Sequence, residues 1–313
     1  TNYDEKLFKK ITKKFSKLKG DSYSLLKVND LLDDINDIAL SKQYEFINAS
    51  IVEKISDDKI NLDINISESD KFYIEKINIK GNFNTLEEVI RNNLIVDEGD
   101  PFNEILFNKS VNNIKSLGIF KKVKTDVTDG SKNSFKEINI DVEERPTGEI
   151  SITAGFGTTG ETIGAGIKEN NFLGKGIRLN TNVELTPESI KGQFIYTKPN
   201  FNYSDNTLFT SLKSSTSDFL TDSGYKTSDI GFSLGTKFEQ FQNIFLSPEV
   251  DFLIEDLETS DKASSVLKKQ EGSYTDLYFN YSINQDLRDK RFRTESGYVT
   301  TFSQELPLIS DNS

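Results

Sequence analysis

Residues 177–185 read Ile-Arg-Leu-Asn-Thr-Asn-Val-Glu-Leu, and apolar and polar side chains alternate along most of this stretch. Successive side chains of a β-strand point to opposite faces, so the pattern predicts a strand with one apolar and one polar face. The same pattern recurs through the chain after Pro146, and we predict no helix beyond that residue. Pro146 therefore marks a change of period, from helices alternating with strands to strands alone.

The region after Pro146 predicts an antiparallel β-barrel that crosses a membrane. Most of its strands are about ten residues long, which suits a tilted strand in a bilayer. The polar faces include charged side chains, as expected for a wet lumen. A soluble β-sandwich is the alternative, although its strands are usually only about 5–6 residues long. We predict strands at 149–157, 161–169, 177–185, 190–198, 207–216, 228–238, 244–256, 273–284 and 297–305.

The region before Pro146 contains two similar blocks. The first predicts helices at 5–18 and 24–40 and strands at 45–53 and 59–67. The second predicts a strand at 72–80, a short helix from Thr85, a helix at 103–117, and strands at 120–127 and 135–143. A repeat of this size indicates two copies of a β-α-α-β-β domain, the first without its opening strand. The expected domains are 1–70, 71–146 and 147–313.

Composition excludes several kinds of chemistry. The chain has no Cys and no His, which rules out disulfides, catalytic triads that use His, and sites in which Cys or His binds a metal. Its net charge of −12 argues against nucleic acid as a partner. A Gly-x-Gly-x-x-Gly run at 155–160 precedes a strand pattern instead of the helix that a dinucleotide site needs. We therefore expect neither an enzyme nor a cofactor, and the absence of Met suggests a processed or cut N-terminus.

Several motifs, in their order along the chain, resemble the BamA family of outer-membrane protein assembly factors. The turn motif of that family is matched by Asn171, Phe172, Leu173, Gly174 and Gly176. The other similar segments are Gly99–Phe102, Leu117–Phe120, Glu143–Gly148, Asp286–Asp289 and Thr294–Gly297. The resemblance covers essentially the whole chain, although Glu295 interrupts the last motif.

The resemblance implies an architecture and a location. The blocks before Pro146 would be POTRA domains in the periplasm. The strands after it would be the N-terminal half, about nine strands, of a sixteen-strand barrel in the bacterial outer membrane. The segments 171–176, 199–206, 239–243 and 285–296 would then be periplasmic turns. The segments 158–160, 186–189, 217–227 and 257–272 would be extracellular loops.

The resemblance also implies a function, namely assembly and insertion of outer-membrane proteins in the lipid bilayer. Unfolded client proteins would pair with the first barrel strand, and POTRA edge strands would guide them. The pairing edge would be Ile150, Ser151, Ile152, Thr153, Ala154, Gly155 and Phe156. Gly155 and Gly157 would weaken the edge's own pairing, while the alternate apolar side chains would face lipid.

Accessory lipoproteins of the BamD kind are implied as partners, with Arg91 and Glu98 at docking positions. Two other functions stay open. One is a translocation pore of the same superfamily, of the two-partner secretion or TamA type. The other is a soluble β protein that acts in binding or adhesion.

Overall fold

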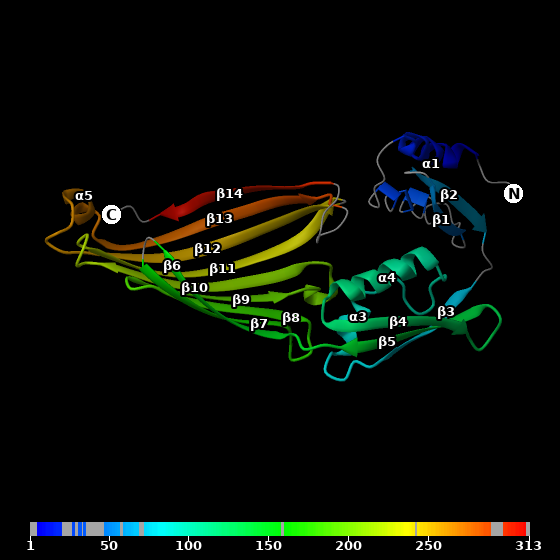
Figure 1. Cartoon of the computed structure of the whole chain (residues 1–313), viewed down its shortest axis with the longest axis horizontal. Helices are drawn as coiled ribbons and strands as arrows, with labels where there is room; N and C mark the ends of the chain where they lie inside the picture. Colours follow the sequence, from blue (N-terminus) through cyan, green and yellow to red (C-terminus); the bar gives the residue numbers. More distant parts are fainter. Residues whose placement is uncertain are drawn as a thin grey trace. The chain divides into compact units, whose positions relative to one another are not determined.

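The computed structural model describes residues 5–20, 27–28, 31–32, 34–35, 47–56, 59–68, 72–157, 160–241, 243–288 and 297–310. The chain forms two compact units (Figure 1). The first contains Thr1–Phe83, Glu87–Glu144 and Leu287–Tyr298, and the second contains Asn84–Leu86, Arg145–Asp286 and Val299–Ser313. None of the helices in the described ranges is both long and apolar enough to cross a membrane.

The first block of the first unit consists of a helix and a β-hairpin. Helix α1 spans Glu5–Leu18, and strands β1 (Ile47–Ser56) and β2 (Lys59–Glu68) pair antiparallel. Ile11 of α1 is buried in a small core, against which Ile64 of β2 also packs. The predicted strands are confirmed within the described residues. Of the helix predicted at 24–40, residues 27–28, 31–32 and 34–35 are helical, and the others lie outside the described residues.

The second block of the first unit contains the largest core. Strands β3 (Tyr73–Lys80), β4 (Phe120–Asp129) and β5 (Phe135–Glu144) form a sheet in the order β3-β5-β4. Strands β3 and β5 are parallel, so a crossover connection must join them. It consists of α3 (Glu87–Arg91), α4 (Glu104–Ser116) and strand β4. The fully buried side chains are Ile74, Ile77, Ile90, Ser110, Ile114, Ile138 and Ile140. All the elements predicted for this block are confirmed.

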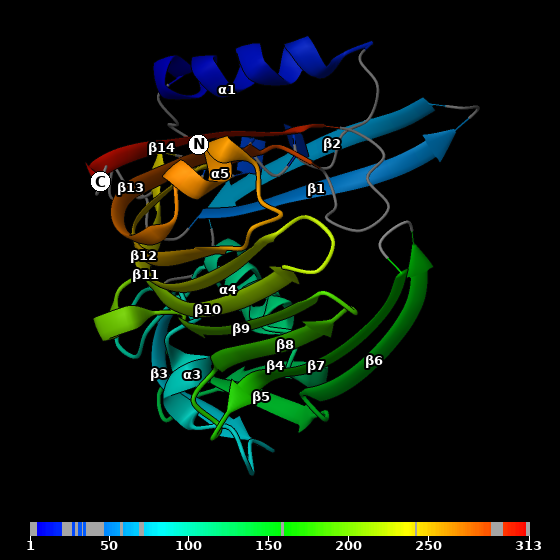
Figure 2. The same cartoon turned by 90° about the vertical axis from the view of Figure 1, so that its left-hand side faces the viewer.

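The second unit is one antiparallel sheet of nine strands, in which every strand pairs with its sequence neighbours. The sheet is curved and does not close, and Figure 2 shows β6 and β14 at its two ends. The strands are β6 (Gly148–Gly157), β7 (Gly160–Phe172), β8 (Ile177–Leu185), β9 (Ser189–Lys198), β10 (Thr207–Phe219), β11 (Tyr225–Phe241), β12 (Ile244–Thr259), β13 (Gly272–Asp286) and β14 (Val299–Ser310). This unit is therefore part of a barrel, as predicted, and not a two-layered sandwich.

The two faces of this sheet differ as the alternating sequence predicts. One face lines a concavity of about 610 Å³ with mainly polar side chains. Lys213 is one of them, and its Nζ forms an ion pair with Asp251 Oδ2 at 2.9 Å. The other face is apolar and exposed. Its large exposed side chains include Ile150, Ile152, Phe156, Ile163, Ile167, Val183, Leu185, Ile190, Phe194, Leu212, Ile230, Phe232, Leu234, Val250, Phe252, Ile254, Ile283, Phe302 and Leu306. Such an exposed apolar face suits contact with lipid.

The prediction that no helix follows Pro146 is wrong. A short helix, α5 (Ser265–Lys269), lies in the predicted loop 257–272, and the Ser264 hydroxyl caps it by accepting a hydrogen bond from Leu267 N at 3.3 Å. Five residues are too few for a helical period to emerge from a window of about 11–18 residues. The predicted loop 217–227 is also shorter than expected, because β10 extends to Phe219 and β11 begins at Tyr225.

Candidate functional site

Strand β6 lies at one edge of the nine-stranded sheet. Within the described residues it pairs with β7 alone, from Gly148↔Glu169 to Gly157↔Gly160. Gly157 and Gly160 are separated by two residues, and such a hairpin begins with a hydrogen-bonded pair. The alternation of an antiparallel ladder then directs the backbone N–H and C=O groups of Ile150, Ile152, Ala154 and Phe156 away from β7. The edge therefore presents a row of backbone donors and acceptors.

The side chains of β6 follow the same alternation. Ile150, Ile152 and Phe156 are 78%, 80% and 87% exposed, and they extend the apolar face of the sheet to its edge. Ser151 and Thr153 instead help to line the polar concavity. The outer side of β6 thus has backbone groups that are unpaired within the described residues, next to an apolar face. A further strand that paired with β6 would continue both the sheet and this apolar face.

The glycines that shape this hairpin are not the ones that the sequence singled out. Gly155 and Gly157 have no neighbouring atom within 4 Å of an added Cβ, and their predicted weakening of the pairing stays a prediction. By contrast, a Cβ on Gly164 would lie 2.5 Å from Thr153 Oγ1, and one on Gly166 would lie 2.7 Å from Ser151 Oγ. Glycine on β7 thus leaves room for the inward side chains of β6.

The turn between β7 and β8 has a fixed internal structure. The Asn171 side chain accepts a hydrogen bond from Gly176 N at 2.8 Å, and the Asn171 carbonyl accepts one from Gly174 N at 2.9 Å. Leu173, Gly174 and Gly176 all have positive φ, at 55°, 71° and 65°. Glycine adopts such angles without strain, which accounts for two of the glycines in the turn motif. Phe172 and Leu173 of the same motif are exposed.

This turn also binds the tripeptide Asn84–Leu86, which belongs to the same compact unit. Asn171 Nδ2 donates to Thr85 Oγ1 at 2.9 Å, and Leu86 N donates to the Gly174 carbonyl at 2.8 Å. A Cβ on Gly174 would collide with the Asn84 carbonyl oxygen. Thr85 was predictable from the sequence only as a helix start, because it lies 86 residues from Asn171 in the chain.

Arg91 and Glu98, the predicted docking residues, meet on the outer edge of β3. Glu98 Oε1 accepts a hydrogen bond from Ile77 N at 2.9 Å, and Arg91 Nη2 donates to the Ile77 carbonyl at 3.0 Å. The two side chains lie 3.6 Å apart, and Arg91 Nε also pairs with Glu87 Oε1 at 2.6 Å. Arg91 and Glu98 therefore have a structural role: they cover the backbone of the edge strand β3, which limits its pairing with other chains.

The two edges of this three-stranded sheet are consequently unequal. Next to the Arg91–Glu98 pair, the outer edge of β3 is also occupied by Gly99 and Asp100, which exchange backbone hydrogen bonds of 2.8 and 2.9 Å with Ile74. On the other side, no strand in the described part of the chain pairs with the outer edge of β4. An extended segment of another chain could thus add to β4 more readily than to β3.

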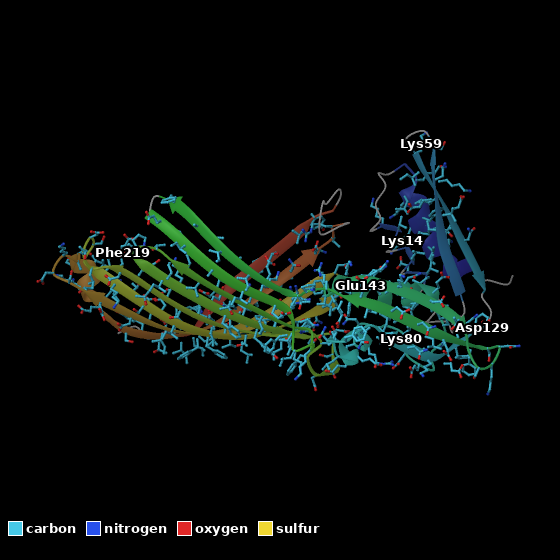
Figure 3. The ribbon with its side chains drawn as sticks, turned by 60° about the horizontal axis from the view of Figure 1, so that its bottom comes forward. Lys14, Lys59, Lys80, Asp129, Glu143 and Phe219 are labelled. Atoms are coloured by element: carbon cyan, nitrogen blue, oxygen red, sulfur yellow. The ribbon has the colours of Figure 1, made fainter. Side chains whose placement is uncertain are left out.

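The end of β5 carries an exposed ion pair. Lys121 Nζ on β4 and Glu143 Oε1 are 2.6 Å apart, and Glu143 is labelled in Figure 3. The hydrogen bond and charge of Lys121 hold the pKa of the Glu143 carboxyl below its usual range. The described residues contain no cluster of three or more side chains of the kinds that bind a metal ion.

Comparison with known proteins finds family matches to two stretches of the chain. The POTRA model, described as a surface antigen variable number repeat, matches residues 72–145, and the Omp85 superfamily domain model matches residues 171–313. A candidate outer membrane protein assembly factor of Treponema pallidum (strain Nichols) is 31% identical over 136 residues, or 42% of this chain and 16% of that protein. The outer membrane protein assembly factor BamA of Neisseria meningitidis serogroup B is 25% identical over 186 residues, or 58% of this chain and 23% of that protein. The chain spans less than a quarter of these relatives.

Solved structures share the fold. The crystal structure of BamA from Haemophilus ducreyi lacking POTRA domains 1–3 has a TM-score of 0.64 and 19% identity, over 98% of this chain and 62% of that chain. CdiB from Escherichia coli has a TM-score of 0.56 and 12% identity, over 96% of this chain and 56% of that chain. At these identities the likeness concerns the fold alone.

Proposed function

The chain belongs to the BamA/Omp85 family and spans part of it, and from this premise we propose that the protein assembles and inserts other proteins in the bacterial outer membrane. Its POTRA domains would lie in the periplasm and its strands in the bilayer. The observation that carries the proposal is strand β6, which within the described residues pairs on one side with β7 and has an exposed apolar face. A client would pair with the other side of β6 when the seam between this strand and the last strand of the barrel opens. No catalytic reaction is part of this function.

The physical task is to bring a strand into lipid without leaving its backbone groups unpaired. Each unsatisfied N–H or C=O group in the hydrocarbon region costs several kcal/mol. A client strand that pairs with β6 satisfies its own groups and those of the edge at once. Pairing through the backbone does not depend on the client's side chains, so one edge can serve many sequences.

We extend the proposal to the last POTRA domain, where the exposed edge of β4 would hold extended client segments before insertion. The covered edge of β3 makes β4 the better candidate within this domain. The predicted domain bounds of 1–70, 71–146 and 147–313 agree with this division of tasks and remain part of the proposal.

Crosslinking tests the pairing of clients with β6. The chain has no Cys, so Ser151→Cys or Thr153→Cys introduces the one thiol of this chain, and any Cys elsewhere in the full-length protein is replaced by Ser. In the full-length protein we expect a disulfide adduct with a Cys-bearing client strand that is stalled during insertion. A Ser215→Cys variant on the interior strand β10, which lines the same concavity, should give none. If a working protein formed no adduct at either β6 position, the proposed pairing of clients with β6 would be wrong.

A lipoprotein partner of the BamD kind would dock at Arg91 and Glu98, through charges that also cover β3. The substitution Glu98→Gln separates the two roles, because glutamine keeps an oxygen that can accept the hydrogen bond from Ile77 N but loses the charge. We expect the stability of the domain to change by less than about 1 kcal/mol, while lipoprotein binding weakens by about ten-fold or more. Denaturant unfolding and a pull-down titration measure the two effects.

The control for this substitution is Glu88→Gln, which removes the same charge from an exposed position on the neighbouring helix α3. It should leave both stability and binding unchanged. If Glu98→Gln bound the lipoprotein as tightly as the unmodified protein, Glu98 would have only the structural role at the edge of β3.

The runner-up function is a translocation pore of the two-partner secretion or TamA type. The likeness to CdiB favours it as an alternative, because the fold by itself does not separate the two functions. The crosslinking experiment distinguishes them. An assembly factor forms adducts at the β6 edge, whereas a substrate that passes through the lumen would react with single Cys residues on the polar inner face of interior strands.

A further inference from the structure

Helix α1 is strongly basic in an acidic protein. It carries six lysines and one glutamate, while the whole chain has a net charge of −12. Lys9, Lys13 and Lys17 are exposed and recur every four residues, so they lie along one face of the helix and form what we call the lysine stripe. Lys14, labelled in Figure 3, instead pairs with Asp34.

The stability of the helix does not account for the lysine stripe. Like charges four residues apart repel, and each such pair destabilises a helix by about 0.2–0.5 kcal/mol. Within the described residues, none of the three lysines of the stripe forms an ion pair. Such a repulsive arrangement is expected where the lysines bind a negatively charged partner outside their own domain.

The opposite face of α1 is already used inside its own block. Ile11 is only 4% exposed and packs with Leu31 and Ile35, and Phe15 and Leu18 pack against the same cluster. Among the described side chains of α1, the apolar ones are thus occupied by this core and leave no apolar face with which to enter a bilayer or an apolar groove. The lysine stripe must therefore recognise its partner through charge alone, without insertion of apolar side chains.

We propose that the lysine stripe binds the anionic phospholipid headgroups of the bilayer in which the strands of the same protein reside. This inference rests on the proposed membrane location. One lysine near an anionic surface strengthens binding to that surface about five-fold, so three lysines strengthen it about 100-fold in total. This contribution alone is too weak to hold a dilute acidic protein on a membrane. It is enough for a surface to which the chain is already tethered, because tethering gives effective concentrations in the millimolar range.

A single fluorescent label tests the proposal. Ser16 is exposed on α1 one turn from Lys13, and Ser16→Cys provides the only thiol in the chain. The full-length protein is reconstituted in vesicles of phosphatidylcholine alone or mixed with phosphatidylglycerol, each with a quencher on the headgroups. We expect quenching in the mixed vesicles only, and we expect added salt to reduce it because salt screens the charges.

Substitutions then assign the effect to the lysine stripe. The triple variant Lys9→Gln, Lys13→Gln and Lys17→Gln should lower the ratio of surface-bound to unbound helix by about 100-fold. The matched variant Lys115→Gln, Lys122→Gln and Lys124→Gln removes the same charge from exposed positions of the second block and should retain the quenching. Circular dichroism should show equal helix content in both, since the first variant only removes repulsion.

Equal quenching in the two kinds of vesicle, or full quenching in the variant without the lysine stripe, would overturn the proposal. So would a response to soluble polyglutamate with none to vesicles, which would point to an acidic protein instead. Protease resistance of the strands reports insertion separately. If insertion fails, the proposed function is in question, but protein that is tethered to preformed vesicles by a terminal polyhistidine tag on nickel-chelating lipid still reports whether the lysine stripe binds the headgroups.

Discussion

Replacing Gly81 by alanine is expected to destabilise the second block by about 4 kcal/mol, a large share of the about 5–15 kcal/mol that stabilises a typical domain. Gly81 follows β3 with a φ of +88°, which an L side chain adopts only at a cost of about 1–2 kcal/mol. A Cβ at this position would also collide with the backbone carbonyl oxygen of Val142 on β5. Since β5 is the central strand, relief of the collision must disturb its pairing with β3.

The matched control is Gly99→Ala. Gly99 has a similar φ of +94°, but no atom lies within 4 Å of an added Cβ. Its replacement by alanine should therefore lower the free energy of unfolding only by the cost of a positive φ for an L residue, about 1–2 kcal/mol. Hydrogen exchange at the amides of Ile138 and Ile140, which are fully buried on β5, measures both effects. Equal losses of protection in the two variants would show that the contact with Val142 is not what requires glycine at position 81.

Ala154→Pro is expected to reduce client insertion by at least about ten-fold if β6 is the pairing edge. Proline removes the N–H of Ala154, which the alternation of the hairpin directs away from β7, so the client strand loses a donor in lipid. One unpaired group there costs several kcal/mol, more than the roughly 1.4 kcal/mol that a ten-fold change requires. The measurement is the rate at which a client becomes protease-resistant in vesicles.

Ala154→Val is the control, because it keeps the N–H and adds only apolar surface on the outer face. It should insert clients at the normal rate. Protease resistance of the protein's own strands verifies that the proline variant still folds. A folded Ala154→Pro protein with full insertion activity would exclude pairing of clients at this position of β6.

The strand pattern of the second unit was predictable, because alternation depends only on local order along the chain. Ile177 to Leu185 reads as a strand without knowledge of its neighbours, and the structure places β8 at those residues. Helix α5 was not predictable in this way, since five residues with one Ser cap carry too little periodic signal. The roles of Gly164 and Gly166 also escaped prediction, because they depend on Thr153 and Ser151 of the paired strand.

The sites show the same division. The motif Asn171–Gly176 was recognisable from sequence, and so was the change of period at Pro146, since both are contained in consecutive residues. Contacts between distant residues needed the folded chain: Asn171 with Thr85, and Arg91 and Glu98 together on Ile77. Residue order by itself determined the strands, the longer helices, the faces of the strands and the family resemblance, because these follow from local periodicity and short motifs. Only tertiary structure decided which edges are covered and which are open, because an edge is defined by strand pairing across long distances in the chain.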